Sequence, residues 1–406
     1  MISKKILKIL LYISTRAVLY KFKPKVINIT GSVGKTSTKE FTAELLASKF
    51  KILKTKYTQN TEFSVPTNIL QIPLCGNIRT LLAKTPQILK LIFIQKTYPE
   101  ILVLETAVCL PCKRGRIRYL ARLTRPSIGI LTKIAPSHME LFGTIENVVK
   151  EKQGLVEELP SSGFAILNYD DPHIRQMKNH TAAHILFYGL DRRADVWAEN
   201  IKISLENGLT FTLHCQNISY PIKIPKITNK FHIYPILAAI STGLVCGMNL
   251  PEIVKKIRSF KTIKGRGNVI SGIKNTLIIN DCFNSNPASC IASLENFKEI
   301  AGARRKIVVL GDMLEQGDNT EKSHRQIGIK AKDTADFLIC VGKNSKFIAQ
   351  EAQNQGLPKE KISWHKNSEK ATKFIAKISK PQDAILIKGS HGMRLEKIIE
   401  NLKAND

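Results

Sequence analysis

Val26-Ile27-Asn28-Ile29-Thr30-Gly31-Ser32-Val33-Gly34-Lys35-Thr36-Ser37 is the stretch that decides the fold. A short apolar run, predicted to be a strand, leads into a glycine turn and then into a stretch with helical spacing. Glycines let backbone N–H groups close around phosphate oxygens, and the N-terminus of the following helix adds partial positive charge. We therefore predict a phosphate-binding loop made of Gly31, Ser32, Val33, Gly34, Lys35, Thr36 and Ser37.

Two side chains of this loop have specific expected tasks. Lys35 is placed to reach the terminal phosphates of a nucleotide, and the Thr36 hydroxyl is placed to bind Mg²⁺. The general nucleotide-loop pattern has a glycine six residues before the lysine, but Ile29 occupies that position here. The sequence fits the shorter pattern GxxGKT, and its strand and helix context predicts binding of a nucleotide such as ATP with Mg²⁺.

The rest of the chain alternates apolar runs with amphipathic stretches of helical length, which is typical of parallel sheets covered by helices. Strands are predicted at 26–30, 101–104, 128–132, 165–167, 277–279, 307–310, 337–341 and 385–387, with a more antiparallel patch at 196–224. Helices are predicted at 36–50, 145–159, 234–246, 288–299, 321–332 and 394–402. The expected class is α/β, with a phosphate-loop (P-loop) central domain on a mostly parallel sheet at 25–262 and a Rossmann-like domain at 263–406.

Ligands of open parallel sheets gather beyond the carboxyl ends of the strands, so polar residues just past each strand are candidates for one site. Glu105 follows one predicted strand, and His138 lies in the loop after another. We expect both to face the phosphates beside Thr36 and to hold a divalent ion. The alternatives are a salt-bridge partner at the sheet end for Glu105 and a loop cap for His138.

The second half of the chain repeats this arrangement. The candidates are Asn280 with Asp281, Gly311 with Asp312, and Lys388 with Gly389 and Ser390. The carboxyl edges of the two predicted sheets, facing each other across a hinge near Gly265, would close around ATP and an acceptor and exclude water.

Charge and cysteine content limit the class of protein. Lys and Arg number 62 against 33 Asp and Glu, a net charge of +29, but no basic stripe with interleaved aromatic residues occurs. We therefore attribute the charge to biased composition and expect no nucleic-acid partner. The eight cysteines are scattered, which indicates reduced thiols and a cytoplasmic protein. Cys109 and Cys112 form a single CxxC, too little for a zinc site.

Residues 2–23 mix Ile, Leu and Tyr with six Lys or Arg, too many charges for a transmembrane span. We interpret residues 1–24 as a basic amphipathic N-terminal helix. It either packs on the next domain or makes peripheral contact with anionic lipid at the inner face of the membrane.

Several stretches together resemble the Mur ligase family, in order from about Lys25 to Leu402. They are ITGSVGKTST, YPEILVLETAV, PSHMELFGTIENVVKEKQGLVEEL, LNYDD, KGRGN, NDCFNSNPAS, LGDMLEQGDNTEKSH and KGSHGMRLEKII. The resemblance implies an ADP-forming ligase that makes an amide bond through an acyl-phosphate. The last three stretches look like the member of the family that adds D-alanyl-D-alanine to UDP-N-acetylmuramoyl-tripeptide, a monomer acting on small molecules.

The resemblance also implies roles for individual residues. Lys35 would bind phosphate, Thr36 the first Mg²⁺, and Glu105 and His138 a second Mg²⁺. Lys152 is similar to the family's carbamylated lysine, which supports that ion; the alternative is an exposed helical lysine. Carbamylation needs a neutral amine, so burial or positive charge must lower a pKa that is ordinarily about 10.4.

The remaining implied roles concern nucleotide and substrates. Asn60 and Glu62 would contact substrate, Asp281 the ribose, and Arg266 with Asn284 the nucleotide. The acceptor pocket would be lined by Asp312, Lys388, Ser390 and Arg394, for which helix caps or salt bridges are the alternative.

Three departures from the family pattern leave alternatives open. Phe231, His232 and Pro235 stand where the family has a His-Asn pair and an adenine-contacting Asn. The loop CLPCKRGRI is longer and more basic, and only about 24 residues precede the loop strand, where the family has a UDP-binding domain. The alternatives are ligation or amidation of a different acid, folate-type or peptide-like, and a non-catalytic nucleotide-binding partner protein.

Overall fold

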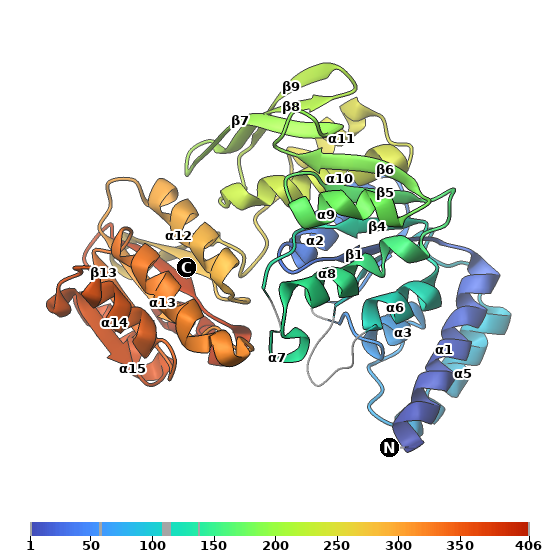
Figure 1. Ribbon diagram of the computed structural model, residues 1–406, viewed down its shortest axis with the longest axis horizontal. Coiled ribbons are helices and arrows are strands. Elements are labelled where there is room, and N and C mark those ends of the chain that lie inside the picture. Colours follow the sequence, from blue (N-terminus) through green and yellow to red (C-terminus); the bar gives the residue numbers. More distant parts are fainter. Residues whose placement is uncertain (1, 57–58, 108–114, 137–138, 405–406) are drawn as a thin grey trace.

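The chain forms two β-sheets, and helices cover both faces of each except at the antiparallel strands within residues 196–224, whose side chains alternate between buried and more exposed (Figure 1). The computed structural model describes residues 2–56, 59–107, 115–136 and 139–404. The first sheet uses residues 25–224 and the second residues 268–388. The predicted α/β class is confirmed. The domain limits at 24 and 262 stay predictions.

The first sheet has nine strands in the order β2-β3-β1-β4-β5-β6-β7-β8-β9. Neighbours from β2 to β7 pair in parallel, and β7, β8 and β9 form the antiparallel patch that the sequence predicts. The strands are β1 (Lys25–Thr30), β2 (Ile52–Lys54), β3 (Ile101–Glu105), β4 (Ile128–Leu131), β5 (Phe164–Asn168), β6 (His184–Gly189), β7 (Val196–Ser204), β8 (Gly208–Cys215) and β9 (Ile218–Ile224).

The second sheet has six strands in the order β10-β11-β15-β12-β13-β14, parallel except for β10. They are β10 (Asn268–Gly272), β11 (Thr276–Asp281), β12 (Lys306–Gly311), β13 (Phe337–Val341), β14 (Ile362–His365) and β15 (Ala384–Lys388). Successive residues of its central strands enter opposite cores, as strand geometry requires. Val308 packs under α12 and α13, for example, whereas Ile307 and Val309 pack under α15 and α16.

The helices connect and cover these strands. They are α1 (Ile2–Phe22), α2 (Lys35–Leu46), α3 (Ser64–Ile69), α4 (Ile78–Leu82), α5 (Thr85–Leu89), α6 (Arg116–Thr124), α7 (Met139–Phe142), α8 (Ile145–Gln153), α9 (Pro172–Gln176), α10 (Ile233–Val245), α11 (Leu250–Ile257), α12 (Pro287–Ala301), α13 (Thr320–Lys332), α14 (Lys346–Asn354), α15 (Ser368–Ile378) and α16 (Glu396–Leu402), with a π-helical turn η1 (Lys90–Ile94) after α5. The helix predicted at 145–159 is wrong in its second half, because α8 ends at Gln153 and a 3₁₀ turn follows at Val156–Glu158.

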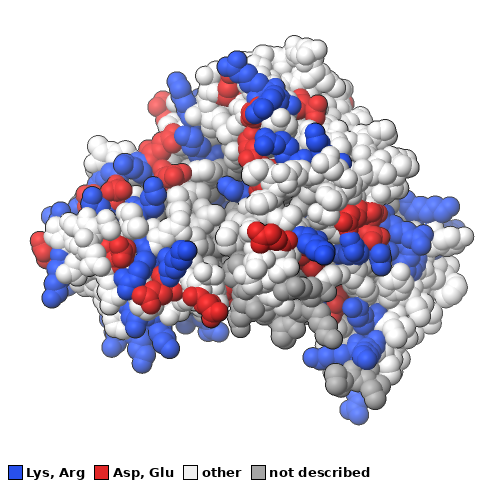
Figure 2. Space-filling model, in the orientation of Figure 1, with Lys and Arg blue, Asp and Glu red and all other residues white. Residues whose placement is uncertain are grey.

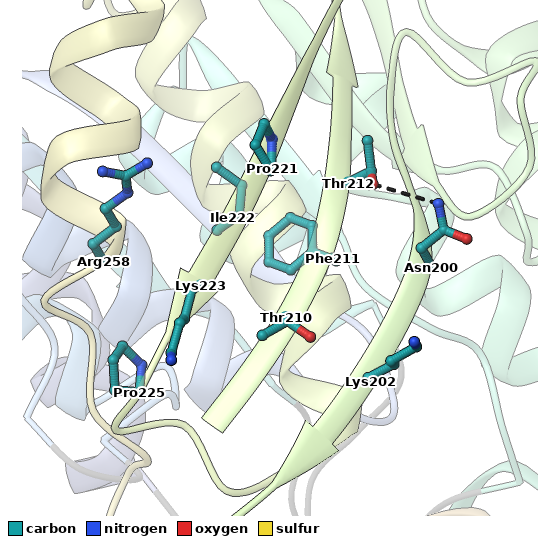
Figure 3. Close-up of a pocket in the computed structure, with 10 residues that line it drawn as sticks. All are labelled: Asn200, Lys202, Thr210, Phe211, Thr212, Pro221, Ile222, Lys223, Pro225 and Arg258. Atoms are coloured by element: carbon teal, nitrogen blue, oxygen red, sulfur yellow. Dashed lines mark hydrogen bonds between the residues drawn. The ribbon is translucent and has the colours of Figure 1, made fainter. Parts of the chain in front are cut away.

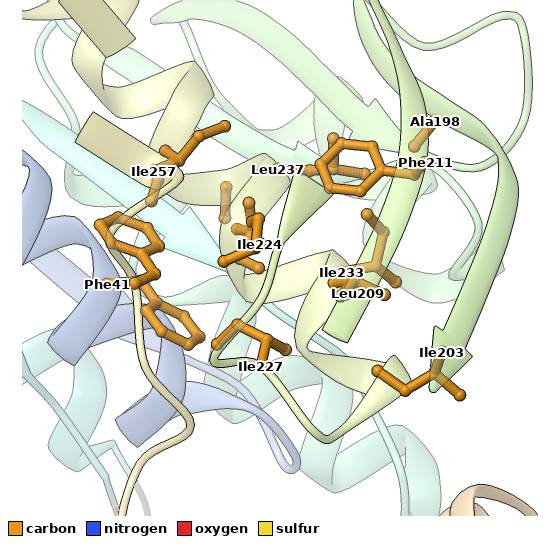
Figure 4. Packing of buried hydrophobic residues seen from close by; sticks show 14 of the residues in the cluster. Phe41, Ala198, Ile203, Leu209, Phe211, Ile224, Ile227, Ile233, Leu237 and Ile257 are labelled. Carbon is orange, nitrogen blue, oxygen red and sulfur yellow. The ribbon is translucent and has the colours of Figure 1, made fainter. Parts of the chain in front are cut away.

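The largest core joins the antiparallel patch to the helix that begins at the phosphate loop. Phe41 of α2 stacks on Phe260 with ring centroids 5.0 Å apart. Around this pair, α10 and α11 bring Ile233, Leu237 and Ile257 against the inner face of β8 and β9 (Figure 4). Burial of these side chains fixes α2 in place, so the loop before it is held by the core of the domain.

Candidate functional site

The loop between β1 and α2 has the backbone that a phosphate loop requires. Gly31 and Gly34 have φ values of +148° and +89°, a region that favours glycine. A Cβ at Gly31 would come within 2.0 Å of the Thr132 hydroxyl oxygen. The Ser32 N–H donates to the Lys133 carbonyl at 2.6 Å, so the loop is anchored to the residues that follow β4.

Lys35 and Thr36 form the first turn of α2, whose N-terminus faces the cleft between the two sheets. Lys35 is partly buried, and its Nζ donates to the Ser32 carbonyl at 3.2 Å. Loss of hydration lowers the pKa of Lys35, the Arg266 charge adds to this, and Glu105 opposes it. The helix N-terminus and this cation both favour a bound anion.

Glu105 lies beside the loop because of strand register. In the parallel pair of β1 and β3, Ile29 is the partner of Glu105, so its carboxylate emerges at the level where the loop begins. Asn60 Nδ2 donates to Glu105 Oε1 at 3.0 Å. Within the described residues Oε2 accepts no hydrogen bond, and its nearest cation, the buried Lys39 Nζ, lies 3.9 Å away. One carboxylate oxygen is therefore buried without a hydrogen-bond donor.

These oxygens suit Mg²⁺. The Thr36 hydroxyl and the orphaned Glu105 oxygen are hard donors of the kind that Mg²⁺ binds through one or two protein groups plus phosphates and water. No group of three His, Cys, Asp or Glu side chains suited to a metal occurs in the described ranges. His138 lies outside the described residues, so its expected place as a ligand stays a prediction.

Lys152 is buried on α8, which excludes the alternative of an exposed helical lysine. Its side chain is 2% exposed. Burial, with help from the Lys35 charge, lowers the pKa of Lys152 to about 7, while Glu151 and Glu105 oppose this shift. The neighbouring Glu151 is also buried and accepts from the N–H groups of Gly115 and Ile117.

The second sheet brings a charged pair to the other side of the cleft. Lys388 Nζ donates to Asp281 Oδ2 at 2.8 Å and to the Asn284 carbonyl at 3.1 Å. Strand pairing again explains the contact, because Asp281 of β11 is the partner of Lys388 of β15. Both residues are buried.

Arg266 reaches from the start of the second sheet to the loop of the first. Its Nη2 donates to the Thr36 hydroxyl oxygen at 3.3 Å, and its guanidinium lies 4.0 Å from the centroid of the Phe283 ring. Loss of hydration lowers the pKa of Arg266, and Asp281 and Glu105 oppose this. Arg266 from the second sheet and Thr36 from the first, which the sequence placed on different sheets, are therefore in direct contact.

Two adjoining cavities lie in this cleft. The larger, about 550 Å³, is lined by Ser32, Val33, Gly34, Lys35, Thr36, Asn60, Thr61, Glu105, Ala107, Arg266, Phe283, Asn284, Asn286, Ser289, Leu314, Glu315, Ser390, His391 and Gly392. The smaller, about 200 Å³, is lined from the other side of the loop by Ser37, Thr132, Asn229, Phe231, His232, Tyr234, Pro235, Asp281 and Lys388, among others. Val33, Gly34, Ser289 and Arg266 border both. The phosphate loop therefore lies between the two cavities.

The residues that depart from the family pattern line the smaller cavity. His232 is buried and packs edge-on against Phe41, with ring centroids 5.2 Å apart. Burial and the Arg266 charge lower the pKa of His232 to about 3, so the ring is neutral. Phe231 and Pro235 make this wall apolar, which suits the flat face of a base.

Three predicted substrate contacts have other partners in the structure, and a fourth lies outside the two cavities. Glu62 accepts from Lys8 Nζ at 3.1 Å and pairs with Arg116 at 3.2 Å. Asp312 accepts from the N–H groups of Asn344 and Ser345, at the start of α14.

The other two lie on one loop after β15. Ser390 lines the larger cavity and accepts from the Leu314 N–H. Arg394 is exposed in a left-handed turn before α16 and lines neither cavity. The cap alternative therefore describes the contacts of Asp312, and the salt-bridge alternative describes that of Lys388.

Sequence reasoning missed two residues of the cleft and one that is buried behind it. Phe283 stacks under Arg266, Thr61 lines the larger cavity, and Lys39 lies against Glu105 and Glu40. A lysine four residues after Lys35 reads as a solvated helix position. Only the packing of α2 against β2 and β3 buries it.

Another hollow, about 650 Å³, lies against β7, β8 and β9 and α11 (Figure 3). Lys202, Lys223 and Arg258 surround the side chains of Phe211 and Ile222 there. It shares no lining residue with the cleft and contains no acidic side chain. We therefore place the candidate active site at the phosphate loop.

Comparison with known proteins shows what the chain is similar to. The model of the Mur ligase middle domain matches residues 29–243, and that of the Mur ligase, glutamate ligase domain matches residues 265–391. The chain is 28% identical over 388 residues to a UDP-N-acetylmuramoyl-tripeptide–D-alanyl-D-alanine ligase of Bacillus subtilis, covering 95% of this chain and 78% of that one. The corresponding ligase of Escherichia coli is 28% identical over 387 residues, covering 94% and 77%.

Solved structures show the same fold. A MurF ligase from Thermotoga maritima in complex with ADP superimposes with a TM-score of 0.80 at 24% identity, covering 97% of this chain and 83% of that one. A MurF from Acinetobacter baumannii gives a TM-score of 0.80 at 22% identity, covering 97% and 80%. A pseudomurein peptide ligase type C from Methanothermus fervidus gives 0.67 at 19% identity, covering 94% and 80%.

Proposed function

This chain belongs to the Mur ligase family, and on that premise we propose that it is an ATP-dependent ligase that joins D-alanyl-D-alanine to UDP-N-acetylmuramoyl-tripeptide. The observation that carries the proposal is the convergence of the phosphate loop, Glu105 and Arg266 on one cavity. The names of the similar enzymes from Bacillus subtilis and Escherichia coli support this acid and this amine. The product would serve peptidoglycan synthesis.

The reaction has two steps. The substrate carboxylate attacks the γ-phosphorus of ATP, which forms an acyl-phosphate and releases ADP. The acceptor amine then attacks the acyl carbon, loses its proton, and expels phosphate through a tetrahedral intermediate. No nucleophilic side chain is needed, so catalysis rests on alignment and on neutralisation of phosphate charge.

Each side of the cleft has its own task in this proposal. The loop N–H groups and Lys35 hold the phosphates, and Arg266 approaches them from the second sheet. Asp281, fixed by Lys388, faces the smaller cavity, where a ribose would lie. The larger cavity, which reaches Asn60 and Ser390, receives the acid and the acceptor.

Mg²⁺ is the metal that the donor set fits. Thr36 would hold a first ion and Glu105, with His138, a second, and both ions would neutralise charge on the transferred phosphoryl group. Lys152 is proposed to be carbamylated: its neutral amine nitrogen bonds to the carbon of CO₂ and releases one proton to solvent. The pKa of about 7 makes the neutral amine available near neutral pH.

The decisive experiment is to measure ADP release with the tripeptide substrate and D-alanyl-D-alanine, together and separately. Sustained turnover is expected only when both are present, and Lys35→Ala should abolish it while Lys343→Ala, an exposed lysine, should not. Absence of stimulation by the pair would overturn the proposed substrates. Stimulation by another acid would then identify a different ligase of the same family.

We extend the proposal to the oligomeric state and the cellular location of the protein. It works as a monomer in the cytoplasm, with residues 2–23 in peripheral contact with the inner face of the membrane. The apolar and basic side chains that α1 exposes support that contact.

A further inference from the structure

Helix α1 has apolar side chains on two opposite faces. Leu7, Leu11 and Val18 are at most 1% exposed and belong to a core that also contains residues of β1 and β3. The other stripe points to solvent and consists of Ile6, Ile9, Ile13 and Tyr20, which are 43%, 57%, 59% and 77% exposed. Their spacing of three, four and seven residues places them on one face. A helix at the surface needs one apolar stripe, so the fold does not explain the second.

A segment that packs against α1 also exposes apolar side chains. Phe93 and Ile94 of η1 are 75% and 70% exposed, and Leu82 of α4 is 58% exposed. The segment is attached to α1, because Lys21 Nζ donates to the carbonyls of Leu91 and Gln95 at 3.3 and 2.6 Å. Figure 1 shows α1 and α5 side by side at one edge of the molecule. We call α1 together with residues 78–96 the docking face.

The charge of these two segments is of one sign. Residues 1–23 and 63–99 contain ten Lys or Arg and no Asp or Glu. They are Lys4, Lys5, Lys8, Arg16, Lys21, Lys23, Arg79, Lys84, Lys90 and Lys96. Figure 2 shows Lys and Arg side chains gathered at the edge that α1 occupies. Biased composition does not account for this, since elsewhere acidic residues accompany the basic ones.

We propose that the docking face binds the surface of an anionic lipid bilayer, with the apolar stripe and Phe93 entering the headgroup boundary. Lys and Arg beside an apolar stripe suit a surface that is negative outside and apolar beneath. Among the described residues no helix is long and apolar enough to cross a membrane, so the contact is peripheral. This deepens the membrane contact proposed above and rests on it, but not on the ligase reaction.

The test is sedimentation of the full chain with vesicles. Wild type is expected to bind vesicles of phosphatidylcholine mixed with phosphatidylglycerol at least tenfold more tightly than vesicles of phosphatidylcholine alone. High salt should release it, because each basic residue near such a surface contributes through a screened attraction. ADP release measured in solution reports the ligase reaction separately, so the two proposals can fail independently.

Variants of exposed residues locate the surface without disturbing the core. The pairs I9E/I13E on α1 and F93E/I94E on η1 should each weaken vesicle binding by about tenfold or more, and K90Q/K96Q should weaken it as well. The matched controls are I218E/I329E, at sites 48% and 44% exposed, and K373Q/K377Q on α15. They should bind like wild type, and all variants should keep turnover in solution.

Three results would overturn the proposal. The first is equal affinity for anionic and neutral vesicles, and the second is unchanged binding by both glutamate pairs. The third is a wild-type dimer in sedimentation velocity that I9E/I13E makes monomeric, with no binding to vesicles. In that case a second copy of the chain covers the face.

Discussion

Arg266 donates a hydrogen bond to the hydroxyl oxygen of Thr36, over 3.3 Å, and so links the start of the second sheet to the first turn of α2. The ring of Phe283 supports the guanidinium from below at 4.0 Å. A cation is therefore held against the phosphate loop by this hydrogen bond and by packing. Groups fixed in this way stabilise developing charge without reorganisation.

Arg266→Ala should lower kcat by about 10²–10³, the loss typical of removing one fixed donor to a reacting group. Steady-state ADP release would measure it. Arg304→Ala, an exposed arginine of the same domain, is the matched control and should leave turnover unchanged. Equal turnover of wild type and Arg266→Ala would mean that Arg266 only supports the hinge.

Lys152 should make turnover depend on pH and CO₂. Because burial lowers its pKa to about 7, the neutral amine that reacts with CO₂ becomes common as pH rises through about 7. Turnover should therefore rise between about pH 6 and 8 and fall in CO₂-depleted buffer. Lys152→Met should lose both effects, and Lys150→Met, at an exposed position of the same helix, should keep them.

Lys152 should also affect stability in CO₂-free buffer. The folded pKa is lowered, so above about pH 7 the unfolded chain binds a proton that the folded chain does not. The free energy of unfolding then rises with pH until about pH 10.4, which is the ordinary pKa of a lysine in the unfolded chain. From pH 7 to 9, urea unfolding should show the free energy of unfolding of wild type rising relative to that of Lys152→Met. Parallel curves would show that the lysine is solvated.

The sequence predicted the central strands well because these strands are buried on both faces. It missed the edge strands β2, β10 and β14 and the strand β6, which are only partly buried. Runs such as 101–104 and 385–387 are continuously apolar, and parallel pairing of such strands places Glu105 and Lys388 at the carboxyl edges. The antiparallel patch at 196–224 was likewise predictable from its alternation. Fold class and the position of the cleft therefore follow from local patterns.

Partners across the fold could not be predicted in this way. Asp312 follows a strand just as Glu105 does, but its carboxylate accepts from two N–H groups of a segment more than thirty residues later. Lys39 looks like a solvated helix position until α2 packs on β2 and β3. Which polar residue faces a ligand depends on such long-range contacts.

The buried pair of Lys388 and Asp281 should be costly to break. Removing one partner leaves an uncompensated buried charge, so Lys388→Met and Asp281→Asn should each lower the free energy of unfolding by about 3–5 kcal/mol. The double variant should recover part of this loss. The exposed pair Lys230 and Glu299 is the control, for which about 0–1 kcal/mol is expected. Losses of equal size in both pairs would contradict the burial argument.

The role of Glu62 can be tested directly, because a residue that binds substrate and a residue that only stabilises the fold through ion pairs give different results when mutated. It pairs with Lys8 of α1 and with Arg116, whose side chain is 8% exposed, and it borders Asn60 and Thr61 of the cleft. Glu62→Gln should destabilise the fold by about 1–3 kcal/mol, because it leaves the buried guanidinium without its charged acceptor.

If this tie is what Glu62 provides, Arg116→Gln should raise the KM for the acid substrate as much as Glu62→Gln does, since both release the loop that carries Asn60. The control is Lys5→Ala, an exposed lysine of the same helix, which should change neither stability nor KM. A direct substrate contact gives a different pattern: Glu62→Gln then raises KM while Arg116→Gln affects only stability. Comparing KM with the free energy of unfolding for the three variants decides between the two roles.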